Sequence, residues 1–272
     1  MGNAADILRV VRETTGIDFS GYRPQTAERR IRSRMSTLRI GDLADYERVL
    51  RDSSGEVQLL IERLTIKVSR FYRNPEVFDA LRAELVPLLA QLGRPVRLWS
   101  AGCGRGEEAH SLAMLLEESD VTGEVLATDI DPLALLGVRQ ARYAPAALVD
   151  VPAAWRRRFF EQQRFFEQQQ PGSPLHAVAK NVKRRVQVEQ ADLTRGPGPE
   201  GAPFDLICCR NVLIYWDAAA QRAILEQLLR RLRPGGWLCL GEAEWLDPVA
   251  AGLDVLAAPL RLFRSASTAR PA

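Results

Sequence analysis

The sequence has few of the residue types that build metal centres and disulfide frameworks. It contains only two histidines, His110 and His176, in 272 residues, so a metal site made of several imidazoles is excluded. Its four cysteines have neither the density of a disulfide framework nor the paired spacing of a zinc site. We therefore expect a reduced protein that holds no metal.

Long apolar runs and a strong net charge are also missing. No stretch approaches the roughly 18 apolar residues that span a bilayer, and the first residues lack the apolar segment of a secretion signal. A formal net charge of +3 does not mark a nucleic-acid-binding protein. We expect a cytoplasmic protein with no membrane insertion and no nucleic-acid partner. A hydrophobic content of 46% suffices for one large or two modest domains.

Two patterns divide the chain. In the first eighty or so residues, apolar positions recur at steps of three and four, which predicts helices at 7–17, 26–38, 42–52 and 57–66. From residue 95, short apolar runs alternate with helical patterns. The expected strands are 96–100, 125–127, 186–189 and 204–209, the expected helices are 107–118, 132–142 and 218–232, and a final antiparallel pair covers 237–240 and 260–263. This predicts an α/β domain with a parallel, doubly wound sheet, preceded by a small helical domain.

Residues 143–185 fit neither pattern. They contain a tandem repeat, RFFEQQ at 158–163 and again at 164–169, followed by a proline-containing break. A connection of about 40 residues is longer than usual, so we expect an inserted subdomain near 150–185.

A glycine-rich loop, AGCGRG at 101–106, follows the first expected strand. Glycines permit a sharp turn and let a ligand approach the backbone, as in dinucleotide sites. The next helix opens with Glu107 and Glu108, which would repel a phosphate and attract a cationic ligand. This favours S-adenosylmethionine over NAD. Asp129 ends the second strand, about 20 residues past the loop, where an acid commonly binds ribose hydroxyls.

Polar side chains also follow the expected strand at 204–209. Arg210 and Asn211 come directly after it, at the edge of the sheet where ligands of open α/β folds bind. Tyr215 lies slightly further on. The sequence leaves open whether Tyr215 packs in the core or lies beside a sulfonium group.

Several strings occur in a characteristic order: ERRIRSRM, LTIKVSRFYRNPEVF, WSAGCGRGEEAHSLAM, ATDIDPLAL, FDLICCRNVLIYWD and RPGGWLCLGEAEWL. Together they resemble the chemotaxis-receptor glutamate O-methyltransferases, the CheR family, over roughly residues 5–265. The combination of CRNVLIY with SRFYR and GEE is far more specific than the glycine loop. Two departures are Ala109-His110 where the family usually has Pro-Tyr, and Gly104-Arg105 where Ser-Thr is more common.

The resemblance implies a helical substrate-docking domain over residues 1–83 and a Rossmann-like S-adenosylmethionine-dependent methyltransferase domain over 84–272. It implies methylation of glutamates on the cytoplasmic domain of methyl-accepting chemoreceptors, with S-adenosylhomocysteine as product, in chemotaxis-type signalling. The insertion near 150–185 resembles a small β-hairpin element that can tether a receptor peptide in this family.

The resemblance also implies residue roles. Arg73 matches an arginine beside the methyl donor that is proposed to orient the substrate carboxylate, and Tyr215 matches a tyrosine near the donor sulfur. Glu108 matches the acid that binds the donor's amino group, and Asp129 matches the acid that holds its ribose. The other matched cofactor-binding positions are Lys67, Ser69, Gly102, Asp192, Leu193, Arg210 and Asn211.

The chemistry of the residues agrees with this reaction. A glutamate side chain has an unperturbed pKa of about 4.3, so it is an anion at neutral pH and its methylation needs no general base. The reaction does need alignment with the methyl donor and an orienting cation, which an arginine supplies.

A basic segment near the N-terminus has two interpretations. Between Tyr22 and Arg39, six arginines accompany one glutamate, a local excess of 6 − 1 = +5. The segment is either a solvated helix face or a docking surface for acidic receptor helices, formed by Arg29, Arg30 and Arg34.

Alternatives remain for the whole chain: a catalytically weak module that binds the cofactor as a ligand, or a methyltransferase of the same fold with another acceptor, such as RNA or a small molecule. An NAD-dependent oxidoreductase is disfavoured by Glu107 and Glu108.

Overall fold

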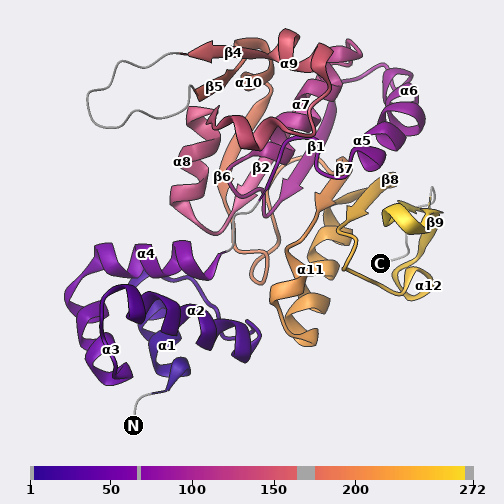
Figure 1. Cartoon of the computed structure of the whole chain (residues 1–272). Helices are drawn as coiled ribbons and strands as arrows, with labels where there is room; N and C mark the ends of the chain where they lie inside the picture. Colours follow the sequence, from indigo (N-terminus) through magenta and orange to yellow (C-terminus); the bar gives the residue numbers. More distant parts are fainter. Residues whose placement is uncertain (1–2, 66–68, 164–174, 267–272) are drawn as a thin grey trace.

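The computed structural model describes residues 3–65, 69–163 and 175–266. Four helices open the chain and lie together beside the rest of the molecule (Figure 1). Three of them begin at a capping side chain, because Asn3 accepts from the Asp6 amide, Asp42 from the Ala44 amide and Ser53 from the Glu56 amide. Their bounds are α1 Ala4–Thr15, α2 Pro24–Thr37, α3 Leu43–Asp52 and α4 Ser54–Leu64.

The second part of the chain is built on a seven-stranded sheet with the order β6-β2-β1-β7-β8-β10-β9 within the described residues. The first five strands in that order are parallel, and β10 is antiparallel to both β8 and β9. The bounds are β1 Val96–Ala101, β2 Gly123–Asp129, β6 Val186–Gln190, β7 Phe204–Cys209, β8 Leu232–Leu240, β9 Leu253–Ala257 and β10 Leu262–Ser265. The predicted α/β class and the predicted antiparallel end of the sheet are confirmed.

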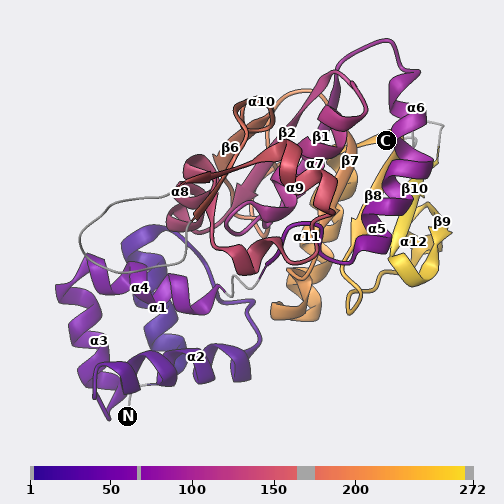
Figure 2. The same cartoon turned by 45° about the horizontal axis from the view of Figure 1, so that its top comes forward.

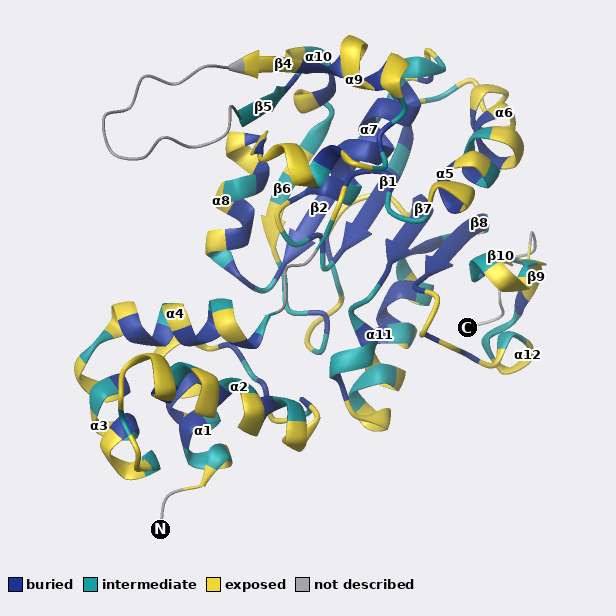
Figure 3. Cartoon of the chain, in the orientation of Figure 1, coloured by how far each residue is buried: buried dark blue, intermediate teal, exposed yellow. Residues whose placement is uncertain are grey.

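Helices cover both faces of this sheet. Residues Leu112 and Leu115 of α7 pack in one core cluster with Cys208 of β7, whereas Leu228 of α11 packs in a second cluster with the adjacent Cys209. The inner strands are accordingly buried along their length (Figure 3), as parallel strands with helices on both faces must be. The bounds are α7 Glu107–Glu118, α8 Pro132–Gln140 and α11 Ala218–Arg231, with short helices η3 Leu213–Tyr215, α12 Pro248–Ala251 and η4 Ala258–Leu260.

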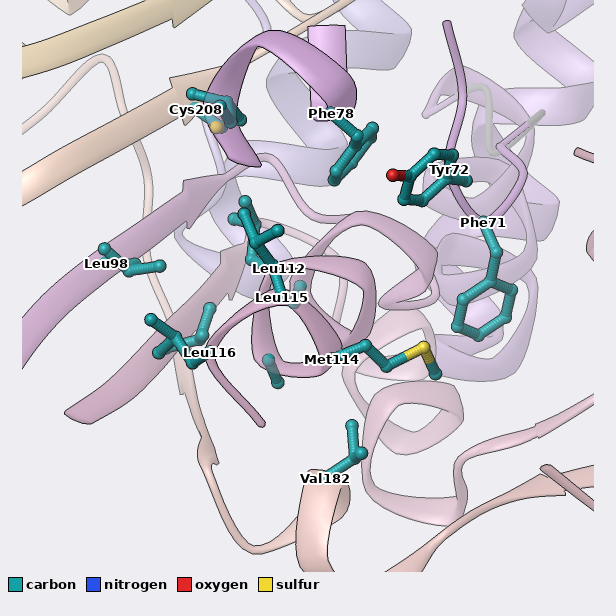
Figure 4. Close-up of a cluster of buried hydrophobic side chains, with 14 of the residues drawn as sticks. Phe71, Tyr72, Phe78, Leu98, Leu112, Met114, Leu115, Leu116, Val182 and Cys208 are labelled. Carbon is teal, nitrogen blue, oxygen red and sulfur yellow. The ribbon is translucent and has the colours of Figure 1, made fainter. Parts of the chain in front are cut away.

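The segment before β1 also belongs to the core of the sheet. Phe71, Tyr72 and Phe78 share a cluster with α7 and with Leu98 of β1 (Figure 4). This segment continues through α5 Pro75–Ala80, η1 Leu81–Leu85 and α6 Val86–Ala90. A division of the chain at residue 83 stays a prediction.

The region between α8 and β6 forms a small antiparallel sheet of order β3-β5-β4, drawn at the top of Figure 1. Its elements are β3 Arg142–Tyr143, η2 Pro145–Leu148, α9 Ala153–Phe159, β4 Phe160–Gln163, β5 Leu175–Val178 and α10 Lys180–Lys183. The second copy of the RFFEQQ repeat lies outside the described residues.

The helical part is fastened to the sheet part by backbone bonds. Tyr22 and Trp216 form an isolated antiparallel bridge. The Arg23 amide donates to the Tyr215 carbonyl at 2.9 Å, and the Asp217 amide donates to the Gly21 carbonyl at 2.8 Å. Both views show α1–α4 at one end of the sheet (Figures 1 and 2). These bonds place the loop before α2 directly beside the segment that follows β7.

Candidate active site

The loop between β1 and α7 is held tightly against the end of β2. The amides of Gly102 and Cys103 both donate to the Thr128 carbonyl at 2.8 Å. Gly102, Gly104 and Gly106 all have positive φ angles, which only glycine adopts at little cost. At Gly102 the need for glycine is also steric, because a Cβ there would overlap Val212. The predicted glycine loop therefore forms a turn that packs against the loop after β7.

Two adjoining hollows open around this turn, at the carboxyl ends of β1, β2 and β7. They share Gly102, Gly104, Asn211 and Tyr215. The first hollow is mainly apolar and is also lined by Phe19, Tyr22, Thr65, Asp129, Ile130, Ala191, Leu193, Val212 and Trp216. The second is also lined by Ser69, Arg70, Arg73, Phe78, Cys103, Glu108, Arg210 and Ile214. We call them the apolar hollow and the arginine hollow.

Asp129 lies at the wall of the apolar hollow, at the end of β2. One carboxylate oxygen accepts from the Gly104 amide at 2.8 Å, and the other accepts from the Asp131 amide at 3.0 Å. Asp131 caps α8 and also accepts from Gln58 and Thr65 of the helical part. Asp129 is suitably placed to accept hydrogen bonds from ribose hydroxyls, because a carboxylate has more acceptor sites than these two amides use.

Glu108 and Arg210 form a partly buried pair in the arginine hollow. One oxygen of Glu108 accepts from the Ser100 hydroxyl at 2.7 Å, and the other lies 3.6 Å from Nη1 of Arg210. Nη2 of Arg210 donates to the Asn74 side chain at 2.7 Å. Glu107, by contrast, is buried away from both hollows, and burial raises its pKa. Of the two glutamates that open α7, only Glu108 faces the site.

Arg73 projects from a backbone that is unusually constrained. Its neighbours Tyr72 and Asn74 have φ angles of 57° and 59°, a conformation that side-chain-bearing residues rarely adopt and that accompanies functional sites. The Tyr72 amide donates to the Ser111 hydroxyl at 3.0 Å, and the Phe71 amide donates to the Ala147 carbonyl at 2.9 Å. These bonds hold the turn that directs Arg73 and Ser69 to the same hollow.

Tyr215 lies where the two hollows meet. Its ring stacks on Tyr22 at 5.9 Å between centroids, with 13° between the ring planes. Burial raises the pKa of its phenol, and the guanidinium groups of Arg30 and Arg73 oppose that rise. A residue of α2 and a residue of the turn before α5 therefore both act on Tyr215. This proximity joins the basic helix to the site.

The other predicted site residues are placed as follows. Leu193 lines the apolar hollow, but the carboxylate of Asp192 accepts from the amide and hydroxyl of Thr194 and does not line it. Asn211 lines both hollows. Lys67 lies outside the described residues, so its role stays a prediction.

Arg34 does not belong to a docking surface. Its guanidinium makes two hydrogen bonds to the buried carboxylate of Glu56, at 2.8 and 2.7 Å, and Tyr46 donates to the same carboxylate. The cation compensates a buried charge, so Arg34 joins α2 to α4. The sequence-based prediction for Arg34 was wrong, whereas Arg29 is exposed and Arg30 is half-buried.

Several residues of the site were missed in the sequence. Phe19, Tyr22 and Thr65 come from the helical part and enter the apolar hollow only through its contact with the segment after β7. A local pattern carries no signal for such a contact. Within the described parts of the chain, no cluster of three or more histidine, cysteine or acidic side chains could hold a metal ion, and no helix is long and apolar enough to cross a membrane.

A glycine turn after the first strand, an acid at the end of the next strand and a glutamate at the start of the first helix define a nucleoside-cofactor site on a Rossmann-like sheet. Comparison with known families makes this specific. The family model described as the CheR methyltransferase SAM-binding domain matches residues 67–259, and that of the CheR methyltransferase all-alpha domain matches residues 4–65. The chain belongs to the CheR methyltransferase family and is an S-adenosylmethionine-dependent methyltransferase.

Three relatives illustrate the similarity. "Chemotaxis protein methyltransferase 2" of Pseudomonas aeruginosa is 32% identical over 85% of this chain and 81% of its own length. "Probable biofilm formation methyltransferase WspC" of Pseudomonas putida is 34% identical over 89% of this chain and 56% of its own length. An uncharacterised 104.1 kDa protein of Rhodobacter capsulatus is 30% identical over 97% of this chain, which spans only 27% of that relative.

Proposed function

We propose that this protein transfers the methyl group of S-adenosylmethionine to glutamate side chains on the cytoplasmic domain of methyl-accepting chemoreceptors, in chemotaxis-type signalling. The products are a glutamyl methyl ester and S-adenosylhomocysteine. Relatives named chemotaxis protein methyltransferase support the pathway class. The protein itself works in the cytoplasm, where that receptor domain lies.

The arginine hollow is the observation that carries the choice of acceptor. Arg70, Arg73 and Arg210 line it together with a single carboxylate, Glu108. An excess of guanidinium groups favours an anionic acceptor, and a planar guanidinium matches a carboxylate bidentately. The one described histidine near this region, His110, is fully buried on α7 and does not line the hollow. Methylation of an ionised glutamate needs no such base.

Bound S-adenosylmethionine supplies an electrophilic methyl group on a sulfonium. We assign its nucleoside to the apolar hollow, with Asp129 toward the ribose and Leu193 toward the adenine, while Gly102 and Asn211 form the walls. Glu108 accepts from the amino group of the donor, with Arg210 beside it and Ser69 on the same rim. Lys67 stays a predicted member of the set.

The transfer itself needs alignment more than acid–base chemistry. Arg73 would hold the acceptor carboxylate, and Tyr215 would border the donor. S-adenosylmethionine would supply the methyl group to a carboxylate oxygen and keep the electron pair of the broken methyl–sulfur bond as a neutral thioether, so the residues of the site would not need to move a proton. Positioning of this kind accounts for much of the rate gain in bimolecular reactions.

Helix α2 is the proposed docking surface, through Arg29 and Arg30. Burial raises the pKa of the Tyr215 phenol, and Arg30 lies close enough to oppose that rise, so the helix borders the site itself. Acidic receptor helices would meet this face with complementary charge, which mainly raises the association rate.

The test is transfer of radiolabelled methyl from S-adenosylmethionine to receptor-bearing membranes of the source cell, followed by mild base. The expected result is label on a receptor-sized band that base releases as methanol, because a carboxyl methyl ester is base-labile. Base-stable label would assign the protein to another acceptor, such as RNA or a small molecule. Cofactor binding without any label, with receptor shown to be present, would favour a binding module.

A further inference from the structure

The carboxylate of Glu244 is buried beside the loop that follows β7, next to the site. It is 3% exposed and sits in the turn after β8. Its carboxylate accepts from four backbone amides, those of Gly241 at 2.6 Å, Asn211 at 2.9 Å, and Val212 and Leu213 at 2.7 Å each. Three of the four donors belong to the loop after β7, about 30 residues away in sequence. One side chain therefore joins the carboxyl ends of two neighbouring strands.

The loop that Glu244 holds forms part of both hollows. Asn211 lines the two of them and has a φ angle of 60°, which a residue with a side chain adopts only when its surroundings impose it. Val212 packs so closely on Gly102 that the glycine position has no room for a Cβ. The loop thus packs directly against the glycine turn and forms part of the wall of both hollows.

The chemistry of the contact requires an ionised carboxylate. Four amide donors match the four acceptor sites of a carboxylate, two on each oxygen. Burial raises the pKa of Glu244, and the four amide hydrogen bonds oppose that rise. Because a buried charge is tolerated only while these bonds are made, the loop has one strongly favoured conformation.

We propose that Glu244 is a positioning residue for methyl transfer. It holds Asn211, Val212 and Leu213 in the conformation that binds S-adenosylmethionine and that begins the turn to Tyr215. It acts through the backbone of this loop and touches neither the donor nor the acceptor.

Glu244→Gln in the full chain tests this proposal. The variant keeps the size of the side chain but presents an amide group to two backbone donors, so the loop cannot keep all four bonds. Calorimetry with S-adenosylhomocysteine should show a dissociation constant raised about tenfold or more. The KM for S-adenosylmethionine should rise similarly, while the KM for receptor changes little. Glu244→Asp keeps the negative charge, so this variant should retain part of the cofactor affinity that Glu244→Gln loses.

Asp205→Asn is the matched control. Asp205 is also a buried carboxylate, on β7, and accepts from Arg94 and from the Arg97 amide away from both hollows. The Asp205→Asn substitution should lower the melting temperature of the protein and leave its affinity for S-adenosylhomocysteine unchanged. Unchanged affinity in a folded Glu244→Gln protein, or an equal loss of affinity in Asp205→Asn, would overturn the proposal.

A second variant covers the case in which Glu244→Gln does not fold. Gly241→Ala keeps Glu244 but adds a methyl group 2.6 Å from its carboxylate and 2.7 Å from the Asn211 amide. It should also weaken S-adenosylhomocysteine binding. Wild-type affinity in this variant would count against the proposal.

Discussion

In the proposed function, single side chains in this site divide between the cofactor and the acceptor. Asp129 ends β2 and Glu108 lies in the first turn of α7, where we assign the nucleoside and the amino acid part of the donor, whereas Arg73 enters from a separate turn before α5. A loss at the first two positions should therefore appear in cofactor binding. A loss at Arg73 should appear in the transfer step.

Arg73→Ala should lower kcat about 10- to 100-fold, the loss expected when a charged hydrogen bond is removed. Affinity for S-adenosylhomocysteine should stay within about threefold of wild type. Steady-state kinetics and calorimetry measure the two quantities. Arg70→Ala is the control, since Arg70 pairs with Asp150 at 3.3 Å and is half exposed; it should have the smaller effect. Equal losses of turnover and affinity in Arg73→Ala would place Arg73 on the cofactor instead.

Asp129→Ala should weaken cofactor binding by about 1–3 kcal/mol. The variant loses a ribose acceptor and also the bond that fixes the Gly104 amide. Calorimetry with S-adenosylhomocysteine measures the change. Asp192→Ala is the comparison, because that carboxylate bonds within its own turn. Wild-type affinity in Asp129→Ala would remove this residue from the site.

The residues that sequence alone could predict share one property. Gly102, Asp129 and Asn211 lie at the ends of strands or within two residues past them, and the carboxyl ends of parallel strands meet at one edge. Glu244 could not be predicted, because its partners lie on another strand end and are reached only after the sheet has formed. Arg34 was misassigned for the same reason, since its partner Glu56 lies on a different helix.

At the scale of elements, prediction depended on whether the boundary signal was local. Helix α7 and strand β7 begin and end where predicted, at Glu107–Glu118 and Phe204–Cys209, because a glycine turn precedes the helix and the strand is a run that is apolar except at Asp205. Helix α4 begins three residues before its prediction, since Ser53 caps it. The edge strand β9 was missed because its residues are mostly exposed and show no alternation.

Helix α2 carries the prediction that belongs to this scale. Arg29→Glu with Arg30→Glu should slow receptor methylation several-fold, and the effect should grow as ionic strength falls, because screening weakens at low salt. Affinity for S-adenosylhomocysteine should be unaffected. Initial rates of receptor methylation at several salt concentrations measure the effect. Arg48→Glu changes charge on the exposed surface of α3 and is the control. Salt-independent, wild-type rates for the double variant would return α2 to a solvated helix face.

At the scale of the whole molecule, two core clusters sandwich the sheet, and the helical part joins the second of them. Polar contacts reinforce this junction, since the Arg23 side chain donates to the Trp216 carbonyl and Gln58 donates to Asp131. The one fully buried histidine of the described chain, His110, packs against Phe71 and Tyr143 of the first cluster. Its ring therefore makes global unfolding sensitive to pH.

His110 should destabilise the fold as the pH falls. Burial lowers its pKa to about 4, while the unfolded chain titrates near 6.5, so between these values the unfolded state binds more protons. His110 therefore leaves the free energy of unfolding nearly unchanged above about pH 6.5. Below that pH it lowers the free energy of unfolding, by about 2 kcal/mol between pH 7 and pH 5. The ring cannot easily accept a proton in the fold, since its Nδ1 has no hydrogen-bond partner within the described residues.

Denaturant unfolding at pH 7 and pH 5 measures this contribution, and comparison of variants removes the part due to carboxylates. His110→Phe keeps a flat ring beside Phe71, where the ring centroids are 6.5 Å apart, and should lose about 2 kcal/mol of the pH dependence. His176→Asn, at the half-buried histidine of β5, is the comparison variant at the other histidine. A His110→Phe protein with the wild-type dependence would show that the buried ring titrates inside the fold as freely as in the unfolded chain.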